Sequence, residues 1–231
     1  MAMVIGYQTA SQANSTFERW WQCQGTWVEP LNQRRAGESG VQLLLPRNPS
    51  HPTLYCKRQT GHLYRSVRHP LGRPTIVREL YAYQAFEQLG VPVPKLVFGS
   101  ARKQAGQWQA LLITQALTGF ISLEQWYQEP HRPEHNQCML AALGETLARM
   151  HRGRWQHGCC YAKHLFVRVH EDEGRSPRAD TALLDLEKSR RRWRTADASR
   201  HDMRQLKRHC GATPESDWQL LMQAYTAALA A

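Results

Sequence analysis

Two stretches of the sequence decide the fold: His157-Gly-Cys-Cys-Tyr-Ala-Lys-His164-Leu-Phe-Val167 and, further along, Leu183-Leu-Asp185-Leu-Glu-Lys188. The first reads as a short polar loop that leads into an apolar strand. The second reads as an apolar strand that an acidic residue closes. This order is typical of a catalytic loop followed by a carboxylate that binds a hard cation. The alternative for a lone Asp at a strand end is a turn cap.

Lys57 and Glu79 lie upstream of these stretches, and each sits on a recognisable element. Residues 53–58 predict a strand that carries Lys57 near its end. A helix is predicted from Thr75 to Leu89, with Thr75 as its N-cap and Gly90 as its stop. The chain order of the four pieces, rather than any one of them, carries the prediction.

Glu79 falls on the apolar arc of that helix, which is formed by Ile76, Leu80, Tyr83 and Phe86. A carboxylate that points toward a core needs a cationic partner, because an unpaired buried charge is costly. Lys57 is the candidate partner, and such a pair can steer an ammonium onto the α and β phosphates of a nucleotide. The alternative is an ordinary salt bridge on the helix face, since Glu87 lies on the same arc.

A second candidate phosphate contact is the segment Gly37-Glu-Ser39-Gly40, which precedes a predicted strand at 41–45. Backbone N–H groups at such a hairpin tip can cover phosphates. Gly37, Ser39, Gly40 and Lys57 are therefore the candidate nucleotide-binding residues, together with Gln115 at the start of a predicted hinge, 115–119. An ordinary turn explains the two glycines equally well.

Composition narrows the class of partner and of compartment. The 231 residues carry 30 Lys and Arg against 19 Asp and Glu, a net charge of +11 that favours anionic partners. Six cysteines without paired spacing, two of them adjacent, indicate a reducing compartment. No apolar run approaches the roughly 18 residues of a membrane span, and from the first residues we expect no secretion leader. We therefore expect a cytoplasmic protein, one that can rest on the inner-membrane surface.

Strand patterns come first along the chain and helical patterns later. Met139, Leu143, Leu147 and Met150 recur at the spacing of one buried helical stripe. Further helices are predicted near residues 202–208 and 216–230. The fold class is thus α+β, with a small strand-rich lobe at 1–114 and a helical lobe at 115–231.

The order Lys57, Glu79, 157–164, Asp185 and the helix that begins at Asp202 resembles the bacterial lipopolysaccharide kinase family, of the InaA type. The stretches 147–167 and 202–208 are the most specific parts of this resemblance. It implies a two-lobed protein-kinase-like fold, with ATP and Mg²⁺ as co-substrates. It also implies a sugar hydroxyl of the lipopolysaccharide core as the phosphate acceptor.

The resemblance also implies roles for individual residues. Lys57 would hold the phosphates, Glu79 would orient Lys57, and Asp185 would bind the metal ion. Asp202 would tie the backbone of the loop that begins at His157 to the helical lobe. Lys163, in the same loop, is a candidate for neutralising the transferring phosphate.

Two positions depart from the kinase pattern His-Arg-Asp-(four residues)-Asn. Counting from His157, Cys159 stands where the Asp accepts the proton of the acceptor, and His164 stands where the Asn binds metal. A thiol is mostly protonated at neutral pH, but Lys163 and other nearby cations can lower the pKa of the Cys159 thiol. Two outcomes stay open: slow transfer that depends on positioning, or a degenerate pseudokinase that binds nucleotide without efficient catalysis.

Other readings of the polar residues exist. The basic run Arg190–Arg194 suits an acceptor that bears phosphate or carboxylate, and is otherwise a solvated loop. The residues His151, His157, Cys159, Cys160 and His164 could be taken for a zinc site, although they lack tetrahedral ligand spacing. A basic nucleic-acid-binding module would explain the charge, but no module motif is present and we expect no nucleic-acid partner.

Overall fold

The computed structural model of the chain describes residues 3–4, 10–28, 30–34, 37–46, 48–67, 69–171, 173–211 and 213–231. The chain divides into two compact units, Met1–Tyr81 with Pro94–Ala116, and Ala82–Val93 with Leu117–Ala231. The sequence prediction placed a single boundary after residue 114. In the structure the helix that spans 75–89 contributes its last turns to the second unit.

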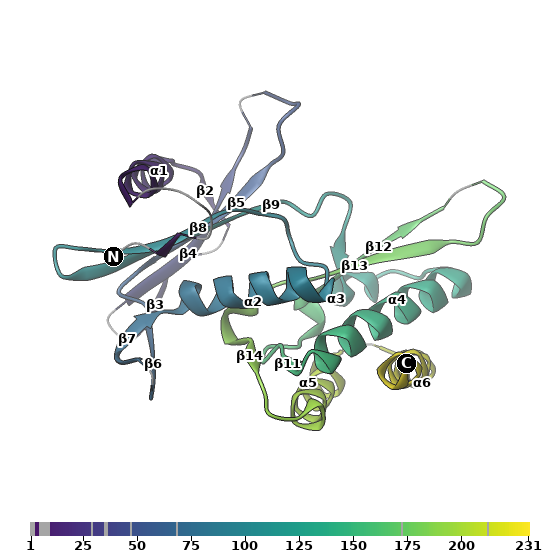
Figure 1. The fold of residues 1–231 in the computed structure, drawn as a ribbon. Coiled ribbons are helices and arrows are strands. Elements are labelled where there is room, and N and C mark those ends of the chain that lie inside the picture. Colours follow the sequence, from purple (N-terminus) through teal and green to yellow (C-terminus); the bar gives the residue numbers. More distant parts are fainter. Residues whose placement is uncertain are drawn as a thin grey trace. The chain divides into compact units, whose positions relative to one another are not determined.

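An antiparallel seven-stranded sheet forms the first unit, in the order β1-β8-β9-β5-β4-β2 with β3 paired to β4 (Figure 1). The strands are β1 (Met3–Val4), β2 (Thr26–Trp27), β3 (Asn32–Arg34), β4 (Gly37–Leu44), β5 (Leu54–Thr60), β8 (Leu96–Gln104) and β9 (Gln107–Gln115). Strands β6 (Leu63–Ser66) and β7 (His69–Pro74) make a separate hairpin. Helix α1 (Ala10–Gln22) covers the sheet, and its Phe17 packs against Cys56, Leu111 and Ile113.

Helix α2 (Thr75–Leu89) has the bounds that the sequence predicts. Thr75 was predicted as its N-cap, but Thr75 is the first helical residue and its hydroxyl lies 3.0 Å from Gln59 Oε1. The backbone N–H of Ile76 donates to the same Gln59 oxygen at 3.1 Å. A side chain from β5 therefore satisfies the helix N-terminus, which fixes α2 against the strand that carries Lys57.

The hairpin tip that the sequence predicted at Gly37–Gly40 is wrong, because these residues belong to strand β4. Gly37 pairs with Arg34 and Glu38 pairs with Gln33 across the β3–β4 hairpin. Residues 35–36, between β3 and β4 in the chain, lie outside the described residues. A Cβ on Gly37 would lie 2.4 Å from the backbone of Gly61, so the glycine permits a close approach of two strands.

Helices dominate the second unit: α3 (Leu123–Trp126), α4 (Pro133–Arg152), α5 (Thr195–His209) and α6 (Glu215–Ala230). The predicted stripe on α4 is confirmed, since Met139, Leu143, Leu147 and Met150 are all completely buried. Gly144 lets helices α4 and α6 pack closely. A Cβ at this position would lie only 2.8 Å from the backbone nitrogen of Tyr225. Figure 1 shows α6 alongside α4.

Small sheets and single turns of helix hold the loops of this unit. Strands β10 (Ile121–Ser122), β12 (Leu165–His170) and β13 (Arg178–Leu183) form one antiparallel sheet. Strand β11 (Trp155–Gln156) pairs with β14 (Arg190–Arg191). Two 3₁₀ turns, η1 (Ala162–His164) and η2 (Leu186–Lys188), follow the loop at 157–161 and Asp185 respectively. The first half of the basic run Arg190–Arg194 is thus a strand, paired with the residues that enter the loop.

Across the described part of the chain, the structure contains no helix that combines the length and the apolar character needed to cross a bilayer.

Candidate functional site

Lys57 and Glu79 form an ion pair in the first unit, with Lys57 Nζ 2.8 Å from Glu79 Oε2. Lys57 lies in mid-sheet, between Val41 of β4 and Leu112 of β9. The Glu79 side chain is only 4% exposed and that of Lys57 16% exposed. The pairing predicted from the apolar arc of α2 is therefore confirmed. Glu87, the rival on that arc, is exposed.

The other candidate nucleotide contacts of the first unit have local structural partners. Ser39 is buried, and its hydroxyl accepts a hydrogen bond from Gln59 Nε2 at 3.3 Å. Gly40 packs so tightly that an added Cβ would lie 2.7 Å from both Trp27 and Leu31. Gln115 ends β9 and pairs with Leu54. Their nucleotide-binding roles stay predictions.

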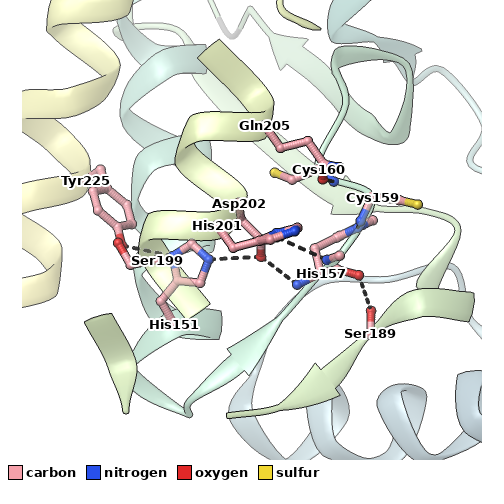
Figure 2. Close-up of polar contacts among 11 residues, drawn as sticks. His151, His157, Cys159, Cys160, Ser189, Ser199, His201, Asp202, Gln205 and Tyr225 are labelled. Carbon is pink, nitrogen blue, oxygen red and sulfur yellow. Dashed lines mark hydrogen bonds and ion pairs between the residues drawn. The ribbon is translucent and has the colours of Figure 1, made fainter. Parts of the chain in front are cut away.

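Asp202 is the centre of a buried polar cluster in the second unit (Figure 2). Its Oδ2 accepts the backbone N–H of His157 at 2.5 Å, and its Oδ1 accepts the backbone N–H of Gly158 at 3.0 Å. His151 Nε2 lies 3.2 Å from Oδ2 and His201 Nδ1 lies 3.1 Å from Oδ1. Burial acts to raise the pKa of Asp202, but the hydrogen bonds from His151 and from the two amides outweigh it and lower the pKa.

Gly158 makes the two amide contacts geometrically compatible. Its φ of 79° lies in the left-handed region, and a Cβ there would lie 2.6 Å from the Lys188 carbonyl oxygen. The loop therefore folds over the Asp202 carboxylate and against the segment that follows Asp185. The Ser189 hydroxyl adds a hydrogen bond to the His157 carbonyl at 3.1 Å.

A chain of polar groups extends from Asp202 away from the loop. His151 Nδ1 lies 2.8 Å from the Tyr225 hydroxyl, which donates to Ser199 Oγ at 2.6 Å. Figure 2 shows this chain of contacts from Asp202 through His151 and Tyr225 to Ser199, which joins α4, α5 and α6. The sequence analysis noticed His151 only as a zinc candidate and missed Tyr225 and Ser199, because the contacts connect positions far apart in the chain.

His157 is completely buried in a neutral state. Its Nδ1 accepts the backbone N–H of Cys159 at 3.2 Å, so the proton of the neutral ring sits on Nε2. Burial lowers the pKa of His157 to about 4, although the negative charge of Asp202 opposes this shift. His157 therefore acts as an uncharged support for the loop.

His164 and Asp185, the two predicted metal ligands, approach each other in the second unit. His164 Nδ1 lies 2.8 Å from the Cys159 carbonyl oxygen, which can only accept, so Nδ1 carries a proton. This leaves His164 Nε2 facing Asp185 Oδ2 at 3.7 Å. The backbone N–H of Leu184 donates to the His164 carbonyl at 2.9 Å and holds the two segments together.

Asp185 does not close strand β13, as the sequence predicted, but follows its end by two residues. Its φ of 58° and ψ of 63° place it in the left-handed region, which Asp tolerates better than most residues. Asp185 does not act as a turn cap, because its side chain makes no capping hydrogen bond to η2. The carboxylate supplies oxygen donors, which Mg²⁺ prefers, whereas the imidazole nitrogen suits Mg²⁺ less well.

Cys159, at the position of the kinase base, is buried. Burial raises the pKa of its thiol, and the nearby Asp185 carboxylate raises it further, while Lys188 opposes both. The idea that surrounding cations lower this pKa is therefore wrong. Lys163, the cation proposed for that effect, is exposed on η1.

The zinc reading is not supported. Among the described residues, no group of three or more His, Cys, Asp or Glu side chains is placed to hold a metal ion. Cys160 is completely buried, and its backbone N–H donates to Gln205 Oε1 at 2.7 Å. Gln205 lies on α5, three residues after Asp202, and binds the loop next to it. The sequence alone did not point to this residue.

Comparison with known proteins shows the family of the chain. The model of the lipopolysaccharide kinase (Kdo/WaaP) family matches residues 18–225. The chain belongs to this family. It is 46% identical to Protein InaA of Escherichia coli (strain K12) over 215 residues, which cover 91% of this chain and 95% of that protein. The family and the InaA-type resemblance predicted from the sequence are confirmed.

Solved structures of family members and of other kinases share the fold. A structure of WaaP in complex with acyl carrier protein matches with a TM-score of 0.68 at 18% identity, covering 98% of this chain and 89% of that one. The crystal structure of the Rio2 kinase from Chaetomium thermophilum matches with a TM-score of 0.52 at 12% identity, covering 94% and 68%. The predicted α+β, protein-kinase-like fold is therefore confirmed.

Proposed function

We propose that this member of the lipopolysaccharide kinase family transfers the γ-phosphate of ATP to a sugar hydroxyl of the lipopolysaccharide core or of a related acceptor. The observation that carries the proposal is the buried ion pair between Lys57 and Glu79. A lysine in the middle of a sheet, oriented by a helix carboxylate, is the device by which kinases hold the phosphates of ATP.

In this proposal, the Asp185 carboxylate and the His164 imidazole would hold Mg²⁺. The ion would neutralise charge on the transferring phosphate. His164 is oriented for this role, because its Nδ1 donates to the Cys159 carbonyl. Asp202 positions the loop through the amides of His157 and Gly158 and touches no reacting group.

Proton removal from the acceptor does not depend on a strong base in this site. The Cys159 thiol is buried and its pKa is raised, so it is protonated at neutral pH. Loose phosphoryl transfer relies chiefly on positioning and charge stabilisation, whereas a general base typically adds about 10²–10⁴-fold. The proposed enzyme is therefore slow rather than inactive.

We place the protein at the cytoplasmic face of the inner membrane. The support is a surface feature: Trp193 is 93% exposed and stands between Arg192 and Arg194. An exposed indole flanked by guanidinium groups suits the interface of an anionic bilayer.

The second candidate function is a pseudokinase that binds nucleotide without efficient catalysis. The buried, protonated Cys159 favours it, because this residue occupies the position of the catalytic Asp. The two functions share the Lys57–Glu79 pair and differ only in turnover.

One experiment separates them. The protein is incubated with ATP labelled in the γ-phosphate, Mg²⁺ and core lipopolysaccharide, in separate reactions with the phosphorylated and the dephosphorylated core, and Mg²⁺-ATP binding is measured in parallel. Label in the acceptor supports the kinase. Binding without label in the acceptor supports the pseudokinase, and the absence of both refutes the nucleotide site.

A further inference from the structure

A basic cavity of about 460 Å³ opens in the second unit beside the loop. Its lining includes Arg192, the α5 residues Arg200, Arg204 and Arg208, and the rings of Tyr161 and His209. The three α5 arginines recur every four residues, so they form one stripe along the helix. The sequence analysis did not single out this stripe.

The charges of the cavity are not balanced by the protein. Asp197 is the one carboxylate in its described lining. None of the four guanidinium groups makes an ion pair or a side-chain hydrogen bond with any residue that the structure describes. Like charges spaced four apart on a helix destabilise it, so the stripe is an arrangement that an anion would stabilise.

The wall of the cavity is also part of the loop's support. Gln205, which lines the cavity, accepts the Cys160 amide at 2.7 Å and donates to the Tyr161 hydroxyl at 3.1 Å. The centroid of the Tyr161 ring lies 5.5 Å from that of the His164 ring and 4.8 Å from that of the His209 ring. Tyr161, which lines the cavity, is therefore also close to the proposed metal ligand His164.

We propose that this cavity binds a phosphate group already present on the acceptor, so that a neighbouring hydroxyl of the same acceptor lies near His164. The proposal rests on the kinase function above. Several guanidinium forks around one space match the charge and the oxygen geometry of a phosphate dianion, and a neutral sugar would leave them unpaired. The protein would then prefer acceptors that an earlier phosphorylation step has modified.

A binding experiment tests the cavity without catalysis. Inorganic phosphate is titrated into the full-length protein by calorimetry. Arg204→Ala is expected to weaken binding about tenfold, the usual value of a hydrogen bond to a charged group. Arg204→Lys keeps the charge but loses the forked guanidinium group. Its affinity for phosphate is expected to lie between those of the wild type and of Arg204→Ala. Arg175→Ala, which removes an exposed arginine that does not line the cavity, should bind phosphate as the wild type does.

The nucleotide site is the competing location for free phosphate. If Lys57→Met abolishes phosphate binding and Arg204→Ala leaves it unchanged, the cavity proposal is overturned. Equal weakening by Arg204→Ala and Arg175→Ala would also overturn it, because it would reveal an effect of net charge alone.

A transfer experiment tests the link to the acceptor. Arg204→Ala is expected to raise KM for phosphorylated core lipopolysaccharide about tenfold, with KM for ATP and for the dephosphorylated core unchanged. Equal KM changes for both acceptors would overturn the proposal. If the wild type modifies neither acceptor, the kinase function fails, and phosphate binding that depends on Arg204 still supports the cavity as an anion site.

Discussion

The Lys57 ammonium and the Glu79 carboxylate, 22 residues apart in the chain, lie 2.8 Å from each other. The pair joins β5 to α2, and the Gln59 side chain joins the same two elements one helical turn earlier. Two independent contacts thus fix the direction in which α2 leaves the sheet. The position of Lys57 is therefore set by the fold and does not depend on a bound nucleotide.

The first prediction separates stability from activity at this pair. Lys57→Met leaves the buried Glu79 carboxylate without its cationic partner, and is expected to lower the free energy of unfolding by about 2 kcal/mol. The double variant Lys57→Met/Glu79→Leu should recover most of that loss but no phosphoryl transfer. Urea denaturation and transfer assays on the three proteins measure both effects. Recovery of transfer in the double variant would contradict the role of Lys57.

Asp202 is predicted to contribute through the loop backbone. Asp202→Ala leaves the amides of His157 and Gly158 without their buried acceptor, and we expect a loss of about 3 kcal/mol in the free energy of unfolding. Asp197→Ala, a carboxylate on the same helix that is only half-buried, is the control and should cost far less. Similar losses in the two variants would show that the cluster does not anchor the loop.

His157 predicts a pH dependence of stability. Its pKa is about 4 in the folded state and about 6.5 in an unfolded chain, so the unfolded chain binds the extra proton between these values. The free energy of unfolding should therefore fall as the pH falls from about 6.5 to about 4, by about 3 kcal/mol in total. Denaturation of His157→Gln across this range should show a flatter curve. The exposed His51→Gln should keep the wild-type slope.

Asp202 and Asp180, whose pKa values are both lowered in the folded state, contribute to the loss of stability below that range. Each carboxylate contributes stability above the unfolded value of about 3.9 that is lost as the pH falls further. His157 and the two carboxylates thus act in adjacent pH windows and can be told apart in one titration.

Local signals in the sequence were sufficient for the elements that carry the site. The range of helix α2 was predicted because Thr75 and Gly90 mark its two ends, although Thr75 is the first helical residue and not the N-cap, and the α4 stripe followed from apolar spacing alone. The Lys57–Glu79 pair was predictable because a carboxylate on an apolar arc demands a cation.

The missed features depend on contacts between distant positions. The strand β3 is built from Asn32, Gln33 and Arg34, whose polar side chains give no strand signal, so the sequence predicted neither β3 nor its pairing with β4. The Gln59 cap of α2 and the contact of His151 with Tyr225 join residues from different elements. No local pattern announces such pairs.

Cys159 supplies a test of how the proton is removed. Because burial and Asp185 raise its pKa, the thiol is no base at neutral pH, and Cys159→Ala should keep the transfer rate within about threefold of the wild type. The pH–rate profile should have no limb that the substitution removes. A loss of 10²-fold or more would make the thiol catalytic, since that is roughly the smallest usual effect of a general base.

His164 is predicted to set the metal preference. His164→Asn replaces the nitrogen that faces Asp185 at 3.7 Å with an amide oxygen, which suits Mg²⁺ better than imidazole does. The variant should reach half-maximal transfer at a lower Mg²⁺ concentration, and His164→Ala at a higher one. An unchanged Mg²⁺ dependence in both variants would remove His164 from the metal site.

The central claim is that the Asp185 carboxylate serves phosphoryl transfer, and Asp185→Asn tests it most directly. Asn keeps the size of the side chain and tolerates the left-handed backbone at this position, whereas Ala would add strain. The measurement is the initial rate of labelled phosphate transfer from ATP to core lipopolysaccharide, with the exposed Glu171→Gln as the matched control. We expect a rate at least about 10³-fold below the wild type for Asp185→Asn, with an unchanged midpoint of thermal unfolding and a normal rate for the control. A wild-type rate in Asp185→Asn would contradict the claim.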